Sequence, residues 1–245
     1  MAIKDQYVKE ISKQYGMKAS WPPSLPINVG TIGKFIKGQF HPQTDLNKLG
    51  ISFSTIRRHF QEVDYASENS VSITAKLAGD PTIPGSILSV AQAGIHIEFT
   101  KKNAILLRAT NNYHILIDDL VSLENQIEQL KRQSKWKKEW AVVTEGINAA
   151  GGTTVIISSQ SSAKVDVLAK AGLTSIQDVN IADINANFSV LKKSYITTSI
   201  VGQAGLMPLF RAWTYKRHPR PAQMVFTKRA GRLRKITSNI AFLNV

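Results

Sequence analysis

Histidine and cysteine are the residue types that most often bind metals or act as nucleophiles, and both are informative in this sequence. The five histidines stand at positions 41, 59, 96, 114 and 218, so no two have the spacing of metal ligands on one helix. His96 lies on the polar side of an alternating segment. The chain has no cysteine, which excludes disulfides, zinc–thiolate sites and thiol nucleophiles. We therefore expect no metal site and no cofactor.

The sequence motifs of common enzyme families are also missing. There is no serine nucleophile elbow and no Gly-x-Gly-x-x-Gly motif. The stretch Gly30–Lys34 lacks the spacing of a phosphate-binding loop and predicts a turn. Asp118 and Asp119 stand where a helix is expected to begin, and acids favour that position because they complement the helix dipole. We expect that the protein is not an enzyme and has no small-molecule substrate.

The positive charge of the chain is concentrated near its C-terminus. The net charge is +14, and residues 184–245 contain eleven Lys or Arg and no Asp or Glu, whereas residues 1–183 carry only about +3. A field of this kind favours association with nucleic acid, anionic lipid or an acidic partner, without selecting among them. A solvated basic face without a specific partner is the simpler alternative.

The first residues mix charges every few positions, and no later run approaches 18 uninterrupted apolar residues. We therefore expect a chain that is made soluble and is not secreted by the ordinary signal.

Two amphipathic helices are predicted. In residues 3–15 the apolar positions recur near helical spacing, and Gly16 would end the helix. A second helix is expected over 116–138, because apolar residues follow at spacings of four, three, four and three: Leu116, Leu120, Leu123, Ile127 and Leu130. Five cations would then complement the C-terminal end of its dipole: Lys131, Arg132, Lys135, Lys137 and Lys138. Between the helices, three prolines in residues 21–26 indicate an extended connector.

Most of the remaining chain alternates between apolar and polar residues, which predicts strands. The expected strands cover residues 29–38, 71–78, 94–100, 103–110, 141–147, 153–159, 185–191, 194–201 and 206–215. We expect residues 149–152 to form a hairpin turn and residues 165–176 to form a weak helix. The fold class is α+β, with a twisted antiparallel sheet and flanking helices. Residues 81–94 are apolar, small and uncharged, which indicates a buried flap or a membrane-seeking tip.

Several of these stretches together resemble the gasdermin pore-forming domain. Glu139-Trp-Ala-Val-Val-Thr-Glu-Gly-Ile followed by Thr-Thr-Val-Ile-Ile is similar to a strand pair that follows a helix in that family. The stretch Phe188-Ser-Val-Leu-Lys-Lys-Ser-Tyr-Ile-Thr-Thr-Ser-Ile-Val-Gly and then Leu209-Phe-Arg-Ala-Trp is similar to two later strands. The resemblance covers residues 70–245 in element order and is most specific at Val142–Glu145. Some bacterial members carry an N-terminal cysteine for lipidation, which this chain lacks.

The resemblance implies a pore-forming function in cell death or anti-phage defence. A monomer that is cytoplasmic when inactive would bind anionic lipid at the inner face of the cell membrane, oligomerise with other copies and refold two regions, 71–110 and 163–202, into hairpins of a membrane β-barrel. The residues expected to contact lipid are Lys4, Lys9, Lys13, Lys131, Arg132, Lys135, Lys137 and Lys138.

The resemblance also divides the chain into a pore-forming domain, residues 1–235, and a possible inhibitory tail, residues 236–245. An activating protease would cut the basic stretch that precedes the tail, near Arg229, Arg232 and Arg234. The alternative is that residues 236–245 are simply the last strand of the core.

Two other functions fit the same sequence. The cations and aromatic residues near the C-terminus, Trp213, Tyr215 and Phe226, also suit phosphate contacts and base stacking in a nucleic-acid-binding protein. A β-rich chain with a basic tail suits a viral or phage structural subunit as well.

Overall fold

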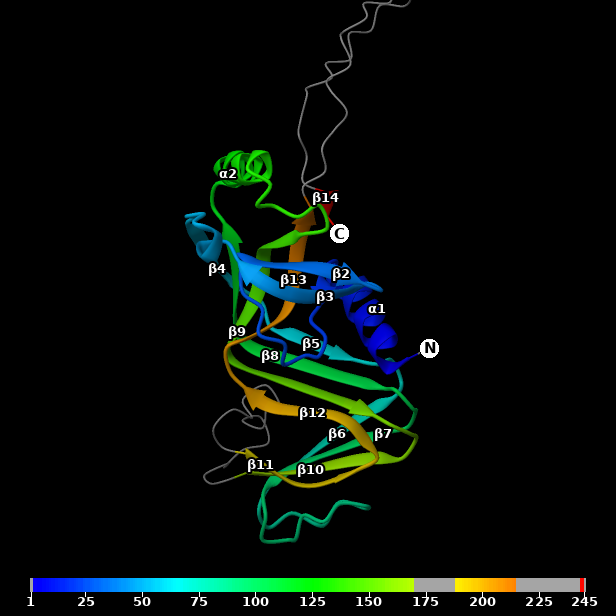
Figure 1. Ribbon diagram of the computed structural model, residues 1–245. Helices are drawn as coiled ribbons and strands as arrows, with labels where there is room; N and C mark the ends of the chain where they lie inside the picture. The colour runs from blue at the N-terminus through cyan, green and yellow to red at the C-terminus, as the bar shows by residue number, and fades with distance from the viewer. Residues whose placement is uncertain (1, 170–187, 215–242, 245) are drawn as a thin grey trace, which may run out of the picture.

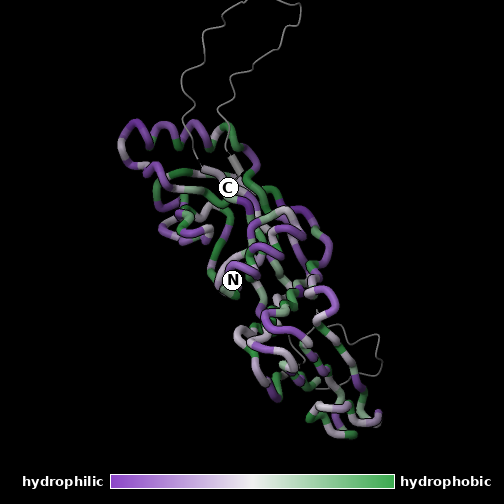
Figure 2. Tube along the Cα trace, turned by 90° about the vertical axis from the view of Figure 1, so that its right-hand side faces the viewer, coloured by the Kyte–Doolittle hydropathy of each residue, from purple (hydrophilic) through white to green (hydrophobic). Residues whose placement is uncertain are grey.

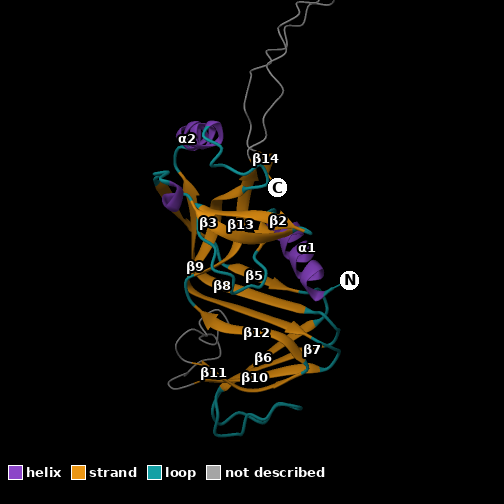
Figure 3. Ribbon diagram, in the orientation of Figure 1, coloured by secondary structure: helices purple, strands orange, loops and turns teal. Residues whose placement is uncertain are grey.

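Antiparallel sheet is the main secondary structure of the part of the chain that the structure describes. The computed structural model describes residues 2–169, 188–214 and 243–244. In this part of the chain a ten-stranded sheet and a four-stranded sheet occur with two α-helices (Figure 3). The predicted α+β class with a mainly antiparallel sheet is confirmed.

The ten-stranded sheet, called the large sheet below, is organised around one long central strand, β9. This strand pairs with four others, β2, β8, β12 and β13. The large sheet contains β1 (Lys18–Ala19), β2 (Thr31–Ile36), β3 (Gln39–Asp45), β4 (Thr55–Phe60), β5 (Val63–Ala66), β8 (Ile105–Ile117), β9 (Ala141–Ser158), β12 (Ile196–Gln203), β13 (Leu206–Thr214) and β14 (Leu243–Asn244).

The four-stranded sheet, called the small sheet, packs against one face of the large sheet. Its strands follow the spatial order β11-β10-β7-β6 and are β6 (Val71–Lys76), β7 (Gly94–Phe99), β10 (Ala163–Ala169) and β11 (Phe188–Ser194). Apolar side chains of β7 and β10 form a core cluster with Leu106 of β8 and Ile156 of β9. Burial of such side chains contributes about 25 cal/mol per Å² of apolar surface removed from water.

The helix α1 (Ile3–Tyr15) covers the opposite face of the same strands. Tyr7 and Ile11 are fully buried there against Ile105, Leu107 and neighbouring residues of β9. Because successive side chains of a strand point to opposite faces, Leu106 faces the small sheet while Ile105 and Leu107 face α1. Strands buried on both faces are apolar at successive positions, as in Ile105-Leu-Leu.

The helix α2 (Leu120–Arg132) lies at one end of the molecule, and a loop of residues 77–93 lies at the other (Figures 1 and 2). Asp119 caps the helix by accepting a hydrogen bond from the backbone N–H of Ser122 at 2.8 Å, in line with the expected helix start. Leu123 and Ile127 pack into a third core cluster with Trp136 and Trp140. A short 3-10 helix, η1 (Asn47–Leu49), lies between β3 and β4.

The predicted helix over 116–138 is therefore too long at both ends. Leu116 is paired with Ile56 as part of β8, and its apolar spacing continued the helical pattern by coincidence. At the other end, Ser134 has a positive φ of 57°, and the chain turns there. Lys135, Lys137 and Lys138 follow this turn, so they do not belong to the helix as expected.

The predicted hairpin turn at 149–152 is also wrong, because β9 runs through it as one strand of 18 residues. Gly151 is explained by close packing, since a Cβ at this position would lie 2.6 Å from Thr110 Oγ1. The β8–β9 pairing shifts register beside it, between Thr110 and Asn112. The extra residue of this bulge lies in β9 itself, where Ala150 and Gly151 stand opposite Asn111 alone.

The weak helix expected over 165–176 is wrong for residues 165–169, which belong to β10 (Ala163–Ala169), a strand that pairs with both β7 and β11. Residues 170–176 lie outside the described part of the chain. Val165 and Val167 alternate with polar neighbours at strand spacing, and this pattern outweighed any helical one.

No helix in the described ranges is long and apolar enough to cross a membrane.

Candidate functional site

The polar face of the small sheet is partly covered by the loop of residues 77–93. Leu88 of this loop is buried, whereas Ile87 and Val90 are 46% and 52% exposed. The loop contains no Lys or Arg, and Asp80 is its one acidic residue. The buried flap expected for residues 81–94 is thus present in part, at Leu88, whereas the membrane-seeking tip stays a prediction.

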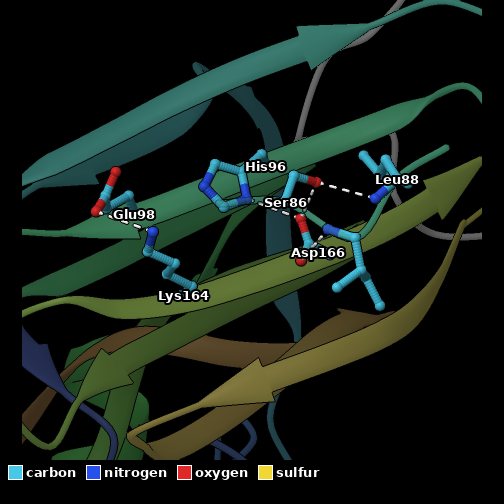
Figure 4. Close-up of polar contacts among 7 residues, drawn as sticks. Ser86, Leu88, His96, Glu98, Lys164 and Asp166 are labelled. Atoms are coloured by element: carbon cyan, nitrogen blue, oxygen red, sulfur yellow. Dashed lines mark hydrogen bonds and ion pairs between the residues drawn. The ribbon is translucent and has the colours of Figure 1, made fainter. Parts of the chain in front are cut away.

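One carboxylate, that of Asp166, joins the loop to the two central strands of the small sheet (Figure 4). Its Oδ1 lies 2.7 Å from Nδ1 of His96 in β7 and accepts a hydrogen bond from the Ser86 hydroxyl at 2.5 Å. Its Oδ2 accepts from the backbone N–H of Ile87 at 3.3 Å. The Ser86 hydroxyl oxygen accepts in turn from the Leu88 N–H at 3.1 Å. The side chains of His96 and Asp166 are each 3% exposed.

These three side chains differ from a hydrolase triad in their order. In a triad the imidazole lies between the serine and the carboxylate, so that it takes the proton of the serine. Here the carboxylate of Asp166 lies between Ser86 and His96, and both bind the same oxygen atom. A carboxylate accepts several hydrogen bonds at once, so the arrangement connects strands and loop.

A buried lysine closes the base of the loop. The side chain of Lys76, at the end of β6, is 1% exposed, and its Nζ donates to the backbone carbonyls of Leu77, Val90 and Gln92 at 3.0, 3.3 and 3.0 Å. An ammonium group has three hydrogens to donate, and these carbonyls match that number. Lys76 therefore connects the two ends of the loop.

A more exposed ion pair lies beside this network. Lys164 Nζ lies 3.4 Å from Glu98 Oε1, and both side chains are about one third exposed. Pairs of this exposure contribute little to stability, about 0–1 kcal/mol. The stronger connection in this region is through Asp166.

The residues expected to contact lipid form two separate groups. Lys4, Lys9 and Lys13 lie on α1, alongside the middle of the molecule (Figure 1). Lys9 and Lys13 are exposed, whereas Lys4 is half-buried. The structure gives α1 one face in the core and leaves these two lysines on the outside.

The second group lies at the end of the molecule occupied by α2. Arg132 bonds Glu128 at 3.5 Å, and Lys131 lies in the same last turn. Lys135, Lys137 and Lys138 are exposed in the following turn. The structure gathers the cations of this group but does not join them to those of α1. Arg229, Arg232 and Arg234 lie outside the described residues, as does the tail except for β14, which pairs with β13.

Two stretches that carry the resemblance lie side by side in the large sheet. Glu145 of β9 is in register with Arg211 of β13, and their side chains form an ion pair at 2.9 Å. The second carboxylate oxygen of Glu145 lies 2.7 Å from Nε2 of His114 in β8. Glu145 thus joins three neighbouring strands.

The sequence pattern did not predict a functional role for Ser86, Lys76 or Asp166. The available signal was a charged residue between two apolar residues of an alternating segment, as with Asp166 between Val165 and Val167. The partner could not be inferred, because His96 is 70 residues away and the contact depends on the register of β7 against β10.

Comparison with models of known protein families found no match, and comparison with curated protein sequences found none either.

Proposed function

We propose that the protein permeabilises membranes: it binds anionic lipid, oligomerises and inserts hairpins formed from residues 71–110 and 163–202. The observation that carries this proposal is the composition of the small sheet. All four of its strands, β6, β7, β10 and β11, come from these two regions. These four strands therefore lie together in one layer, whereas residues 105–110 of β8 and 196–202 of β12 belong to the large sheet.

The two faces of the small sheet differ in the way that a membrane hairpin requires. In β7, Ile95, Ile97 and Phe99 face the apolar cluster, whereas His96 and Glu98 point to the other side. A strand in a membrane barrel needs one apolar face toward lipid and one polar face toward the lumen. The face now packed on β8 and β9 would become the lipid face.

The strands must lengthen to span a bilayer, and the loop provides residues for this. A membrane strand needs about 9–11 residues, whereas β6 and β7 have six each. The part of the loop next to β7, residues 85–93, is compatible with such an extension because it has no charge and no proline, whereas Pro81 and Pro84 suit a turn. Unpaired backbone in hydrocarbon is costly, so insertion must accompany assembly with other copies.

The nucleic-acid alternative has less support. Of the aromatic residues on which it depended, Trp213 packs against the core cluster beneath α2 and is partly buried. Tyr215 and Phe226 lie outside the described residues. A base-stacking platform needs an exposed ring, which Trp213 does not offer in full.

The deciding experiment is dye release from liposomes that contain anionic lipid, with intact protein and with protein cut within residues 229–235. We expect leakage after cutting and not before, and no leakage from zwitterionic liposomes.

Leakage at background from a chain truncated after Arg232 would reject the inhibitory tail. No leakage from any form, together with tight, salt-sensitive binding of RNA or DNA, would favour the nucleic-acid function. Self-assembly without lipid would favour a structural subunit.

A further inference from the structure

We infer that the contacts of Asp166 are a latch that holds the loop of residues 77–93 closed over the small sheet and must open before the two regions can insert. The consequence for insertion rests on the proposed function. The latch itself follows from the geometry of Asp166, Ser86 and His96.

Asp166 ties the first region to the second through its side chain, in addition to the backbone pairing of β7 with β10. The Ser86 hydroxyl and the Ile87 N–H belong to the loop of the first region, and His96 belongs to its strand β7. Asp166 itself belongs to β10 in the second region. An extended hairpin would carry Ser86 and Ile87 away from β10, so their bonds to Asp166 must break before the strands lengthen.

The two ionisable partners of the latch, His96 and Asp166, are buried, whereas Ser86 is half-buried and Ile87 is exposed. Removing one partner of a buried hydrogen bond leaves the other group without water or protein to bind, which is costly. Ser86 binds Asp166 and also accepts from Leu88, whose side chain is 1% exposed. The latch thus fixes the segment that places Leu88 in the core.

Lys76 acts on the same loop from its base. Its three bonds hold Leu77 at one end of the loop and Val90 and Gln92 at the other. In a lengthened hairpin these carbonyls would pair with neighbouring strands, so the ammonium group would lose them. The loop is therefore closed at its middle by Asp166 and at its ends by Lys76.

Hydrogen exchange of the full-length chain tests the latch directly. The amide hydrogens of Ile87 and Leu88 both bind latch atoms, so their exchange reports opening of the loop. Asp166→Asn keeps the side-chain shape but replaces one acceptor oxygen by a donor group. We expect about tenfold faster exchange at Ile87 and Leu88, with exchange in β8 and β9 unchanged.

The matched control is Asp64→Asn, which changes a carboxylate that pairs with Arg108 at 2.9 Å on the large sheet and is 53% exposed. Exchange at Ile87 should stay at the wild-type rate in this variant. If Asp166→Asn accelerates exchange in β8 and β9 as well, the variant has destabilised the core. The milder variant Ser86→Ala then tests the latch, and we expect severalfold faster exchange at Ile87. An unchanged rate at Ile87 in the deciding variant would overturn the latch.

Dye release separates failure of the latch from failure of the proposed function. We expect the Asp166→Asn chain, cut within residues 229–235, to release dye severalfold faster than the cut wild-type chain. Equal release from the two, with faster exchange in the variant, would overturn the role of the latch in insertion. Faster exchange with no release from any form would support the latch as a closure of the loop and reject the pore function.

Discussion

Glu10 and Tyr65 join α1 to the large sheet. The Tyr65 hydroxyl donates to Glu10 Oε2 at 2.7 Å, and the Ser67 hydroxyl donates to the same oxygen at 3.2 Å. Burial, and after it the hydrogen bond to Glu10, raise the pKa of Tyr65 to about 12. Burial also raises the pKa of Tyr7 on the buried face of α1.

The raised pKa values of these tyrosines predict a loss of stability at alkaline pH. An unfolded tyrosine ionises near pH 10, whereas folded Tyr65 keeps its proton until about pH 12. The folded state therefore binds more protons between these values, and the free energy of unfolding falls as the pH rises through this window. In Tyr65→Phe the fall between pH 10 and 12 should be smaller, with the contribution of Tyr7 remaining. Urea unfolding at several pH values between 10 and 12 measures the free energy of unfolding. An equal fall in the wild-type protein and the variant would contradict the prediction.

Glu145 offers a second test at single residues. Glu145→Gln removes the charge that pairs with Arg211 and His114, while its side chain is only 17% exposed. We expect the free energy of unfolding to fall by about 1–3 kcal/mol. Asp64→Asn, which affects a more exposed pair, should cost about 0–1 kcal/mol in the same urea experiment. Equal losses would show that burial does not distinguish the two pairs.

At the scale of elements, residue alternation predicted most strands but not their ends or partners. The segments around Val71 and Ile95 are strands as predicted, and α1 ends at Gly16, which has the expected left-handed backbone with φ of 64°. The errors at 116–119 and 149–152 arose where a pattern has two explanations. Apolar residues of a two-faced strand imitate a helix, and glycines that allow close packing imitate a turn.

The same alternation predicts the effect of charge within the loop. If β7 extends backward in register, Ile87 continues the apolar face of Ile95 and Ile97, and Val90 continues the polar face of His96. Ile87→Asp should therefore abolish dye release by the cut protein, because an acid on the lipid face is unfavourable, whereas Val90→Asp should preserve release. Both side chains are exposed, so both variants should fold.

Val121→Asp is the matched control, since Val121 is 68% exposed on α2 and lies outside both regions. Its release should equal that of the unchanged sequence. Equal inhibition by Ile87→Asp and Val90→Asp would contradict the expected register.

At the scale of the whole molecule, the sequence alone does not show which of the two basic groups, on α1 or beyond α2, binds lipid more strongly. Their separation depends on the fold. We expect the group beyond α2 to make the stronger contact with lipid, because Lys135, Lys137 and Lys138 are close in sequence and all exposed. Replacing these three by Gln should weaken binding to anionic liposomes by about a hundredfold, at roughly 1 kcal/mol per cation. Cosedimentation at fixed salt measures the change.

A control for this comparison removes three cations from another part of the surface, Lys34, Lys37 and Lys48. Their replacement by Gln lowers the net charge equally, so it shows the effect of charge alone. Equal weakening by the two triple variants would mean that total charge, and not the group beyond α2, governs lipid binding.

The central strands β8 and β9 are covered on both faces, by α1 and by the small sheet. A copy that released its small sheet in water would therefore expose two apolar surfaces. One lies on the small sheet, and the other lies around Leu106 and Ile156 of the large sheet. Such a molecule can lower its free energy by closing again, by entering a bilayer or by joining another copy. Release of the small sheet would therefore persist only at a lipid surface or beside another copy, because either one covers the exposed apolar surface again.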